Sequence, residues 1–362
     1  MSGDTYPTLR VAAVQAAPVF LDRESTLDKV DVLVKSAAAE GADLVVFGEL
    51  FLAGYPIWAL VLRPVDLHPF FERQFQNAIE VPGRECARLA AIAAKYGVLL
   101  SIGVNEKSAL SMGTMWNSNL IFDRSGALIN HRRKLVGTYT ERLVYAPGDA
   151  AGLTAVETDG ARIGMLICGE NTNTLARFSL LAQGENIHIA TYPPCGVFER
   201  TAKNFDITDA IRIRAAAHSF EGKVFTVAAS TLPDEDAIEQ VSRGDAEARD
   251  LLTAASPSAS MIVGPRGELL AEPLIGEEGI VIANVDLNTC IAPKLMHDIV
   301  GAYNRFDIFE LNVRQQRLNP AHFNVDARAD AGTQDVTRPS ESLDTWPDDS
   351  VRAISDRIQV QQ

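Results

Sequence analysis

The chain has 362 residues, of which 47% are hydrophobic and 22% charged, and its formal net charge is −14. This is the composition of a globular protein, so it predicts a sizeable core and excludes a chain that is disordered throughout. The acidic balance excludes nucleic acid and anionic membrane surfaces as expected partners, because both require basic patches on the protein.

Short apolar runs alternate with longer segments of helical periodicity, which is typical of an α/β protein. The first part of the chain predicts helices at 25–40 and 83–97 and strands at 9–15, 42–50, 98–104, 118–123 and 127–133. The first helix carries one apolar stripe, as a helix that covers a sheet requires, formed by Leu27, Val30, Val34 and Ala37. A turn at 124–126 predicts a hairpin, so we expect mixed sheets rather than purely parallel ones.

The second part of the chain continues the alternation. It predicts helices at 173–185 and 205–223 and strands at 162–168, 186–192, 224–230, 260–265 and 279–286, with a second hairpin turn at 265–267. An acidic insertion at 232–252 is predicted to be a surface helix. We expect one domain over 1–328, followed by a polar tail, 329–362, that is mobile or docks on a neighbouring subunit.

No segment has the pattern of a signal peptide or of a membrane span. The N-terminus lacks a basic stretch followed by an apolar one. The apolar stretch at 42–62 is interrupted by Asp43, Glu49, Gly54 and Pro56, so a transmembrane helix is not expected.

The cysteines are far apart and form no CxxC or Cys/His ligand spacing; they are Cys86, Cys168, Cys195 and Cys290. This spacing predicts neither a structural zinc site nor a disulfide framework. A reducing cytoplasm is therefore the expected location.

Three reactive side chains fall at the ends of predicted strands, where α/β proteins bind ligands. They are Glu49, Lys134 and Cys168. Taken alone, a cysteine there is usually a packed small hydrophobe and a lysine a solvated strand end. Glu49 is the least ordinary of the three, because it lies in the apolar run "VVFGELFLAGYP" and a buried carboxylate must find a partner or shift its pKa.

Together the three side chains form a physical set. Proton transfer from a cysteine to a glutamate with ordinary pKa values is uphill by about 4 pKa units, or roughly 5 to 6 kcal/mol. Burial of Glu49 would raise its pKa, and the Lys134 ammonium would stabilise a thiolate. The same ammonium would lower the Glu49 pKa, and a second carboxylate, Glu141, is placed to offset that effect.

The blocks around these residues resemble the signatures of the nitrilase branch of the carbon-nitrogen hydrolase superfamily. They are "GELFLAGYP" with Glu49, "NHRRKL" with Lys134, "TYTERLVYAPGD" with Glu141 and "ICGENTN" with Cys168. A further nitrilase-like block, "YPP", follows at 192–194. The order, spacing and flanking residues agree from about Leu9 to Asn312.

The resemblance implies a four-layer α-β-β-α sandwich with mixed sheets and homodimers that build larger homo-oligomers or spirals. It also implies that Cys168 is the nucleophile, Glu49 the general base, Lys134 the stabilising cation and Glu141 the supporting acid. The expected substrates are a small-molecule nitrile and water, with no metal or organic cofactor. Many nitrilases carry Trp after the cysteine, whereas this chain has Gly169, so more space is expected beside the nucleophile.

Candidates for substrate binding lie next to the predicted strand ends. They are Tyr55, Trp58, Gly169, Tyr192 and Pro193, whose apolar and aromatic surfaces are typical of a ligand cavity. The alternative for each is packing in the core or at a subunit contact. Cys195 is not expected to be a second nucleophile, because nothing in "YPPCGVFE" supplies a base.

Other functions stay open at this point. An amidase or N-carbamoyl amide hydrolase of the same superfamily would use the same residues, and an enzyme acting on cyanide is a narrower variant of the nitrilase prediction. A cysteine-histidine hydrolase has six candidate bases, His68, His131, His188, His218, His297 and His322, although His131 should face away from Lys134 in a strand. A non-catalytic oligomeric scaffold would require none of the four reactive residues.

Overall fold

The structure is a computed structural model that describes residues 3–197 and 205–321. The chain divides into two units, Met1–Leu318 and Asn319–Gln362. The predicted tail, 329–362, lies outside the described residues, so its behaviour and the boundary at residue 328 stay predictions.

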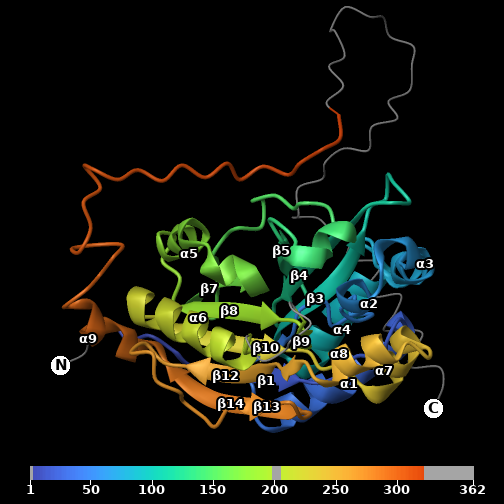
Figure 1. Cartoon of the computed structure of the whole chain (residues 1–362). Helices are drawn as coiled ribbons and strands as arrows, with labels where there is room; N and C mark the ends of the chain where they lie inside the picture. The colour runs from blue at the N-terminus through green and yellow to red at the C-terminus, as the bar shows by residue number, and fades with distance from the viewer. Residues whose placement is uncertain (1–2, 198–204, 322–362) are drawn as a thin grey trace, which may run out of the picture. The chain divides into compact units, whose positions relative to one another are not determined.

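Two six-stranded sheets form the centre of the first unit (Figure 1). In spatial order the first contains β14 (Gly279–Asp286), β1 (Thr8–Gln15), β2 (Leu44–Phe47), β3 (Leu99–Lys107), β4 (Met115–Phe122) and β5 (Leu128–Arg133). The second contains β13 (Leu274–Ile275), β12 (Ala259–Val263), β10 (Phe225–Ser230), β8 (Ile187–Tyr192), β7 (Ala161–Ile167) and β6 (Val156–Thr158). Both combine parallel pairs such as β1–β2 and β7–β8 with antiparallel pairs, which confirms the predicted mixed sheets. A short ladder joins β9 (Cys195–Gly196) to β11 (Ser256–Pro257).

Helices cover the outer face of each sheet (Figure 1). The first sheet packs against α1 (Arg23–Ala39) and α4 (Arg84–Tyr96), and the second against α5 (Thr174–Leu181) and α6 (Ile207–Gly222). The layers therefore follow the order helix, sheet, sheet, helix, and the predicted four-layer sandwich is confirmed.

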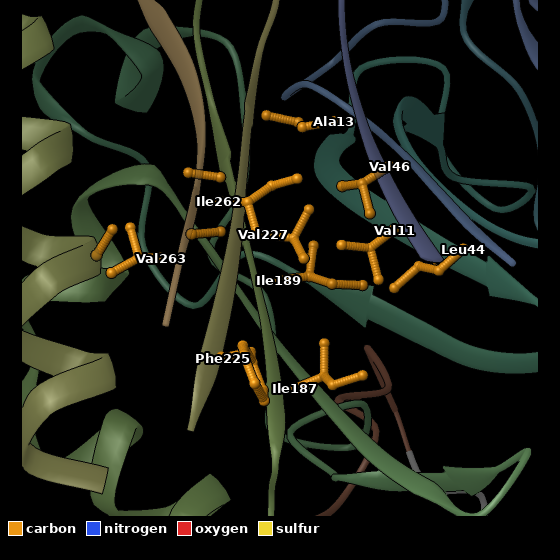
Figure 2. Close-up of a cluster of buried hydrophobic side chains, with 14 of the residues drawn as sticks. Val11, Ala13, Leu44, Val46, Ile187, Ile189, Phe225, Val227, Ile262 and Val263 are labelled. Atoms are coloured by element: carbon orange, nitrogen blue, oxygen red, sulfur yellow. The ribbon is translucent and has the colours of Figure 1, made fainter. Parts of the chain in front are cut away.

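The core lies between the facing sheets, as Figure 2 shows. Val11 and Val46 of the first sheet point toward Ile189 and Val227 of the second. The alternate positions of β1 and β2 pack under α1 and α4 and include Val14. Because both faces of these strands are covered, their sequences are continuous apolar runs, and each fully buried Val, Leu or Ile contributes roughly 1.5–3 kcal/mol.

The first helix forms as its sequence predicts. Asp22 is the N-cap, and its carboxylate accepts a hydrogen bond from the Ser25 amide. The predicted stripe of Leu27, Val30, Val34 and Ala37 is buried against the first sheet. The helix spans 23–39 rather than 25–40.

Several predicted bounds were wrong. The strand predicted at 42–50 ends at Phe47, and the insertion at 232–252 forms two helices, α7 (Glu235–Ser242) and α8 (Ala246–Thr253). Arg243 and Gly244 both have positive φ and break the continuous helix that was expected. The turn at 265–267 is present, but one isolated bridge, Val263 to Leu269, replaces the expected hairpin ladder.

The sequence also left short elements unassigned. They are α2 (Trp58–Val61), α3 (His68–Asn77), α9 (Ile291–Lys294) and the 3-10 helices η1 (Pro64–Asp66), η2 (Tyr139–Leu143), η3 (Cys168–Thr172) and η5 (Leu287–Cys290). Across the described ranges, every helix is too short or too polar to cross a bilayer.

Candidate active site

Strand direction brings Glu49 and Lys134 to one edge of the first sheet. The strands β2 and β3 are parallel, and β3, β4 and β5 alternate in direction, so β2 and β5 point the same way. Lys134 directly follows β5, and Glu49 lies two residues beyond β2. The Glu49 amide donates a hydrogen bond of 3.1 Å to the carbonyl of Tyr192, which ends β8 and so links this edge to the second sheet.

Close backbone contacts explain the glycine before Glu49. A Cβ on Gly48 would lie 2.4 Å from the Thr231 nitrogen. A Cβ on Gly103 of β3 would lie 2.4 Å from the Leu50 nitrogen. The loop that carries Glu49 is therefore held between β3 and the chain that follows β10, and a side chain at either glycine would displace it.

Three buried charged side chains meet at this edge. The Lys134 ammonium donates to Glu49 Oε1 at 2.6 Å and to Glu141 Oε1 and Oε2 at 2.9 and 2.8 Å. Glu49, Lys134 and Glu141 are 0%, 2% and 1% exposed. The structure thus brings together three of the four residues predicted to be catalytic, in a site that excludes water.

Hydrogen bonding distinguishes the two carboxylates. Both oxygens of Glu141 accept from Lys134, and they also accept from the Tyr55 hydroxyl and the Asn117 amide. Glu49 Oε1 accepts from Lys134 and Asn117, whereas Glu49 Oε2 is buried without a partner in the described chain. The free lone pairs on Oε2 make Glu49 the carboxylate that can accept a proton.

The burial and the charges of this site set the protonation of its groups. Burial raises the pKa of Glu49 to about 7, and the charge of Glu141 adds to the rise, although Lys134 opposes it. Burial alone would lower the pKa of the Lys134 ammonium, but the charges of Glu141 and Glu49 outweigh it and raise the pKa. Lys134 is therefore a cation at neutral pH, and Glu49 is a base with a proton affinity suited to that pH.

Cys168 is the first residue of η3, directly after β7, and has φ +49°. It is buried, and the charges of Glu49, Lys134 and Glu141 all act on the pKa of its thiol. Burial raises the pKa of the thiol, Glu49 raises it further, and Lys134 compensates only in part. Burial therefore does not close the pKa gap between Cys168 and Glu49 as the sequence argument expected, because it raises the pKa of both groups, and the resting Cys168 side chain is a thiol.

Glu170 joins the two loops that carry Lys134 and Cys168. Its carboxylate accepts from the Ile167 amide at 2.9 Å and from the Leu135 amide at 2.7 Å. It also forms a buried ion pair of 2.7 Å with Arg132. The sequence analysis assigned Glu170 no role, although a second acid two residues after a buried cysteine was a signal that it needed partners.

The predicted substrate-binding residues have different surroundings. The Tyr55 hydroxyl donates to Glu141 at 3.1 Å, so this residue supports the carboxylate. Trp58 is fully buried, donates to Gln74 at 3.2 Å and stacks on Phe70, so these contacts give it a packing role in α2 and α3. The carbonyl of Pro193 accepts from Ser258 at 2.6 Å, in a buried turn after β8.

Tyr192 has the surroundings of a substrate contact. Its side chain is fully buried, and its hydroxyl has no hydrogen-bond partner in the described chain. Burial raises the pKa of the hydroxyl, Arg214 opposes the rise, and the charges of Cys168 and Glu49 add to it. Ile167 of β7 is paired with Thr191 of β8, so Cys168 and Tyr192 are the next residues of neighbouring strands. An unpaired buried hydroxyl is a donor available to a ligand.

The expectation of free space at Gly169 was wrong. A Cβ on this residue would lie 2.9 Å from Thr138 Oγ1. Thr138 therefore fills the position next to Gly169, and any side chain at residue 169 would have to displace it.

A cavity of about 470 Å³ lies beside the loop that carries Lys134 and Glu141. Its lining comes from α2, η2 and α8 and includes Leu60, Val61, Leu62, Tyr139, Ala248 and Leu251. Its volume falls within the range of small-molecule sites. The sequence analysis chose Tyr55 and Trp58 for this role, whereas the lining residues of α2 lie two to four positions beyond Trp58.

The histidines and Cys195 do not form a second catalytic arrangement in the described chain. His131 bonds Glu106 at 2.8 Å, as expected for a ring that faces away from Lys134, and His188 and His218 bond Glu185. Cys195 is buried in apolar surroundings, and burial raises its pKa to about 12. His322 lies outside the described residues.

Comparison with known proteins agrees with this geometry. The model of the carbon-nitrogen hydrolase family matches residues 10–294. The chain is 34% identical to Nitrilase 3 of an unknown prokaryotic organism over 92% of this chain and 99% of that protein. It is 35% identical to a nitrilase of Paraburkholderia phymatum over 86% and 88%, and 32% identical to an aliphatic nitrilase of Rhodococcus rhodochrous over 87% and 85%.

Solved structures of low sequence identity share the fold. A carbon-nitrogen hydrolase from Helicobacter pylori superposes with a TM-score of 0.63 at 21% identity, covering 80% of this chain and 92% of that chain. The C. elegans NitFhit protein superposes with a TM-score of 0.66 at 16% identity, covering 88% and 70%. From the family match over most of its length and from these relatives, the chain belongs to the carbon-nitrogen hydrolase family, in its nitrilase branch.

Proposed function

We propose that this enzyme hydrolyses an organic nitrile to the carboxylic acid and ammonia, with Cys168 as the nucleophile. The observation that carries the proposal is the Glu49 carboxylate, which is buried against Lys134, keeps one oxygen free and acts on the pKa of the Cys168 thiol. The relatives named nitrilases support this reaction class.

The first step joins the cysteine to the nitrile. The Cys168 sulfur adds to the nitrile carbon while its proton passes to Glu49 Oε2, and Glu49 then protonates the nitrogen to give a neutral thioimidate. Before the transfer, two carboxylates and one ammonium give the site a net charge of −1, and moving the proton from sulfur to Glu49 leaves that charge unchanged. Charge-neutral transfer suits a dry site, because no new net charge has to be solvated.

The second step releases ammonia. Water gives one proton to Glu49 as its oxygen adds to the thioimidate carbon, and Glu49 passes that proton to the nitrogen. The remaining hydroxyl proton follows to the nitrogen through Glu49 as the carbonyl forms, so the tetrahedral intermediate expels ammonia and leaves a thioester. A second water, activated in the same way, cleaves the thioester to the acid and restores the Cys168 thiol. Two waters are consumed for each nitrile.

Lys134 stabilises the negative charge that develops during these steps. When Glu49 is ionised, the Lys134 ammonium is shared between two carboxylates. When Glu49 is protonated, that compensation weakens, and the Lys134 charge becomes available to the substrate. Glu141 keeps the ammonium in place, and the Gly169 amide is the second donor to the developing anion.

An amidase is the alternative, because the same groups would act on an amide or a carbamoyl group. The test is ammonia release from a panel of nitriles and their matching amides, measured with the wild-type enzyme and with Cys168→Ala. We expect faster release from nitriles than from amides, and none from the variant. Faster turnover of the amides would contradict the proposal and favour the alternative.

The cavity beside η2 is the proposed approach for the nitrile, because its lining residue Tyr139 belongs to the loop between Lys134 and Glu141. Of the residues predicted to bind substrate, Tyr192 has the strongest support, since its hydroxyl is unpaired near the nucleophile. Leu60→Phe should therefore raise KM for bulky nitriles more than for small ones. An equal change across sizes would contradict this route.

We also propose that the enzyme forms homo-oligomers. Exposed apolar side chains on α5, on α6 and in the segment after α9 support this proposal. They include Leu175, Ile213, Phe220, Phe306 and Phe309. Sedimentation should give a species larger than a monomer, and replacing Ile213 and Phe220 by Asp should reduce it. The four free thiols support a reducing cytoplasm as the location.

A further inference from the structure

Four buried polar side chains that the mechanism does not use lie together behind the nucleophile. They are Glu185, which precedes β8, His188 of β8, His218 of α6 and Asn171 of η3. Their exposed fractions are 2%, 0%, 1% and 3%. Buried polar groups persist only where their hydrogen bonds are made, so their contacts indicate what the group holds in place.

The contacts form a chain that ends on the backbone of the nucleophile. His218 Nε2 bonds Glu185 Oε2 at 2.9 Å, and His188 Nδ1 bonds Glu185 Oε1 at 2.6 Å. His188 Nε2 bonds Asn171 Oδ1 at 2.8 Å. The Asn171 amide then donates to the carbonyls of Leu166 and Cys168 at 3.2 and 3.1 Å.

This pattern fixes the protons on His188. The amide nitrogen of Asn171 faces two carbonyl oxygens, so its own oxygen faces the ring. A carboxylate and an amide oxygen accept hydrogen bonds and cannot donate them. Both nitrogens of His188 therefore donate, and the ring is an imidazolium paired with Glu185.

The remaining ring is neutral. Burial lowers the pKa of His218 to about 4, and its Nδ1 has no partner in the described chain, so Nε2 carries the proton. Burial alone would raise the pKa of Glu185, but His188 and His218 outweigh it and lower the pKa to about 2. One positive and one negative group thus compensate each other, which makes the network tolerable in a dry interior.

Side chains such as those of Glu185, His188 and His218 also bind metals, but the distances between their polar atoms fit hydrogen bonds better than a shared metal ion. Two ligands at about 2.0–2.1 Å from a tetrahedral zinc lie roughly 3.3 Å apart. Here the ring nitrogens lie 2.6 and 2.9 Å from the carboxylate oxygens, which are hydrogen-bond distances.

We propose that His188 and Asn171 are positioning residues that aim the Gly169 amide at the anion that develops on the substrate. A trans peptide points its C=O and its N–H in opposite directions. Holding the Cys168 carbonyl on Asn171 therefore turns the Gly169 N–H away from the network. This amide lies in the first turn of η3, where N–H groups have no partner within the helix, so within the described residues it is available to a substrate anion. The inference rests on the proposed function, because it names what orients the second donor.

The Asn171 contact also holds the backbone of the nucleophile. Cys168 has φ +49°, a conformation that is unfavourable for a residue with a Cβ and that persists only when its surroundings enforce it. The bond from Asn171 to the Cys168 carbonyl is one of those restraints. Its loss should misdirect the donor without removing the thiol.

Two substitutions of His188 separate its two bonds. His188→Gln keeps a donor that can reach Asn171, as Nε2 does, whereas His188→Asn keeps only a donor toward Glu185, as Nδ1 does. We expect His188→Asn and Asn171→Ala to lower kcat at least 10-fold with KM within about 3-fold, since loss of one such donor lowers kcat by about 10²–10³. His188→Gln should keep most of kcat. Equal kcat for the Gln and Asn variants would overturn the proposal.

A matched control and a second reaction exclude a general loss of structure. Asn130 is also buried and donates from its amide to two backbone carbonyls, those of Gly152 and Thr154, so Asn130→Ala should leave kcat unchanged. Alkylation of Cys168 by iodoacetamide forms no oxyanion, so its rate should stay within about 3-fold in Asn171→Ala. A parallel loss of alkylation and turnover would mean that the network only supports the fold, and would overturn the proposal.

NMR of the 15N-labelled wild-type enzyme tests the network without substrate. We expect one buried ring with protons on both nitrogens, absent in His188→Gln, and one neutral ring with its proton on Nε2. A neutral His188 would overturn the proposal even if no variant folds. Failure of the proposed function is distinct, since the wild-type enzyme would then release ammonia from no nitrile while the NMR result stood.

Discussion

Replacing Glu49 by Gln removes one charge and keeps nearly the same shape. The Gln carbonyl can accept from Lys134 and Asn117, as Glu49 Oε1 does at 2.6 and 2.7 Å. Lys134 keeps both oxygens of Glu141, so the ammonium remains paired and the fold should survive. What is lost is the unpaired oxygen that is proposed to accept the thiol proton.

The expected loss of turnover is large. A general base contributes about 10²–10⁴ to the rate, which corresponds to about 2.7–5.5 kcal/mol of transition-state stabilisation. We therefore expect kcat to fall at least 100-fold. The thiol should respond in the opposite direction, because the charge of Glu49 raises the pKa of Cys168 and its removal favours the thiolate.

Stability should also change, with a definite sign. The pKa of Glu49 is raised from 4.5 to about 7 in the folded enzyme, so folding is favoured when this group is protonated. Its contribution to stability is present below pH 4.5 and is lost as the pH rises through 7, by about 3 kcal/mol for a shift of this size. Because Gln does not titrate, the variant does not lose this contribution. Its free energy of unfolding should therefore rise relative to that of wild type by about that amount as the pH increases from 4.5 to 8.

Three measurements on the two proteins test this reasoning. Ammonia release gives kcat, alkylation by iodoacetamide at pH 9 reports the thiolate, and urea unfolding across the pH range gives the free energy of unfolding. Retention of more than a tenth of kcat by Glu49→Gln would refute the base assignment. Slower alkylation than in wild type would refute the electrostatic argument.

Three further predictions follow from the same contacts. The pH profile of kcat/KM should fall below about pH 7, because Glu49 must be ionised to accept the proton, and a flat profile down to pH 5.5 would contradict this. Glu170→Gln should lower the free energy of unfolding by about 3–5 kcal/mol, since it leaves Arg132 as an unpaired buried charge, and a loss under 1 kcal/mol in urea unfolding would contradict it. Gly169→Ala should destabilise by about 1–3 kcal/mol through its contact with Thr138, and adding Thr138→Ala should restore the melting temperature; no rescue would mean that the crowding lies elsewhere.

The layers of this fold were predictable because they depend on periodicity. The apolar stripe of α1 follows from burial of one face of a helix. The continuous apolar run of β2 follows from burial of both faces of a strand. The short elements were not, because their conformation depends on close backbone contacts. The break between α7 and α8 depends on two residues with positive φ, Arg243 and Gly244, which no hydrophobic pattern encodes.

The site was predictable where residue types alone limit the chemistry. A carboxylate in an apolar run, as at Glu49, had to find a partner, and Lys134, a cation at the end of another predicted strand, was a candidate to offer one. The supporting contacts were not readable, because Asn117, Glu170 and Asn171 resemble ordinary polar residues until the fold shows what they bond. Trp58 and Gly169 show the same limit, since their contacts with Gln74 and Thr138 depend on the fold.

Covalent chemistry at one thiol can be tested against a matched buried thiol. Wild-type enzyme, Cys168→Ala and Cys195→Ala are mixed with excess nitrile and quenched in acid during turnover, and ammonia and peptide masses are measured on the same samples. We predict that wild type and Cys195→Ala release ammonia and carry any adduct on the peptide with Cys168, while Cys168→Ala releases none. Ammonia release by Cys168→Ala would contradict the central claim, whatever the masses show.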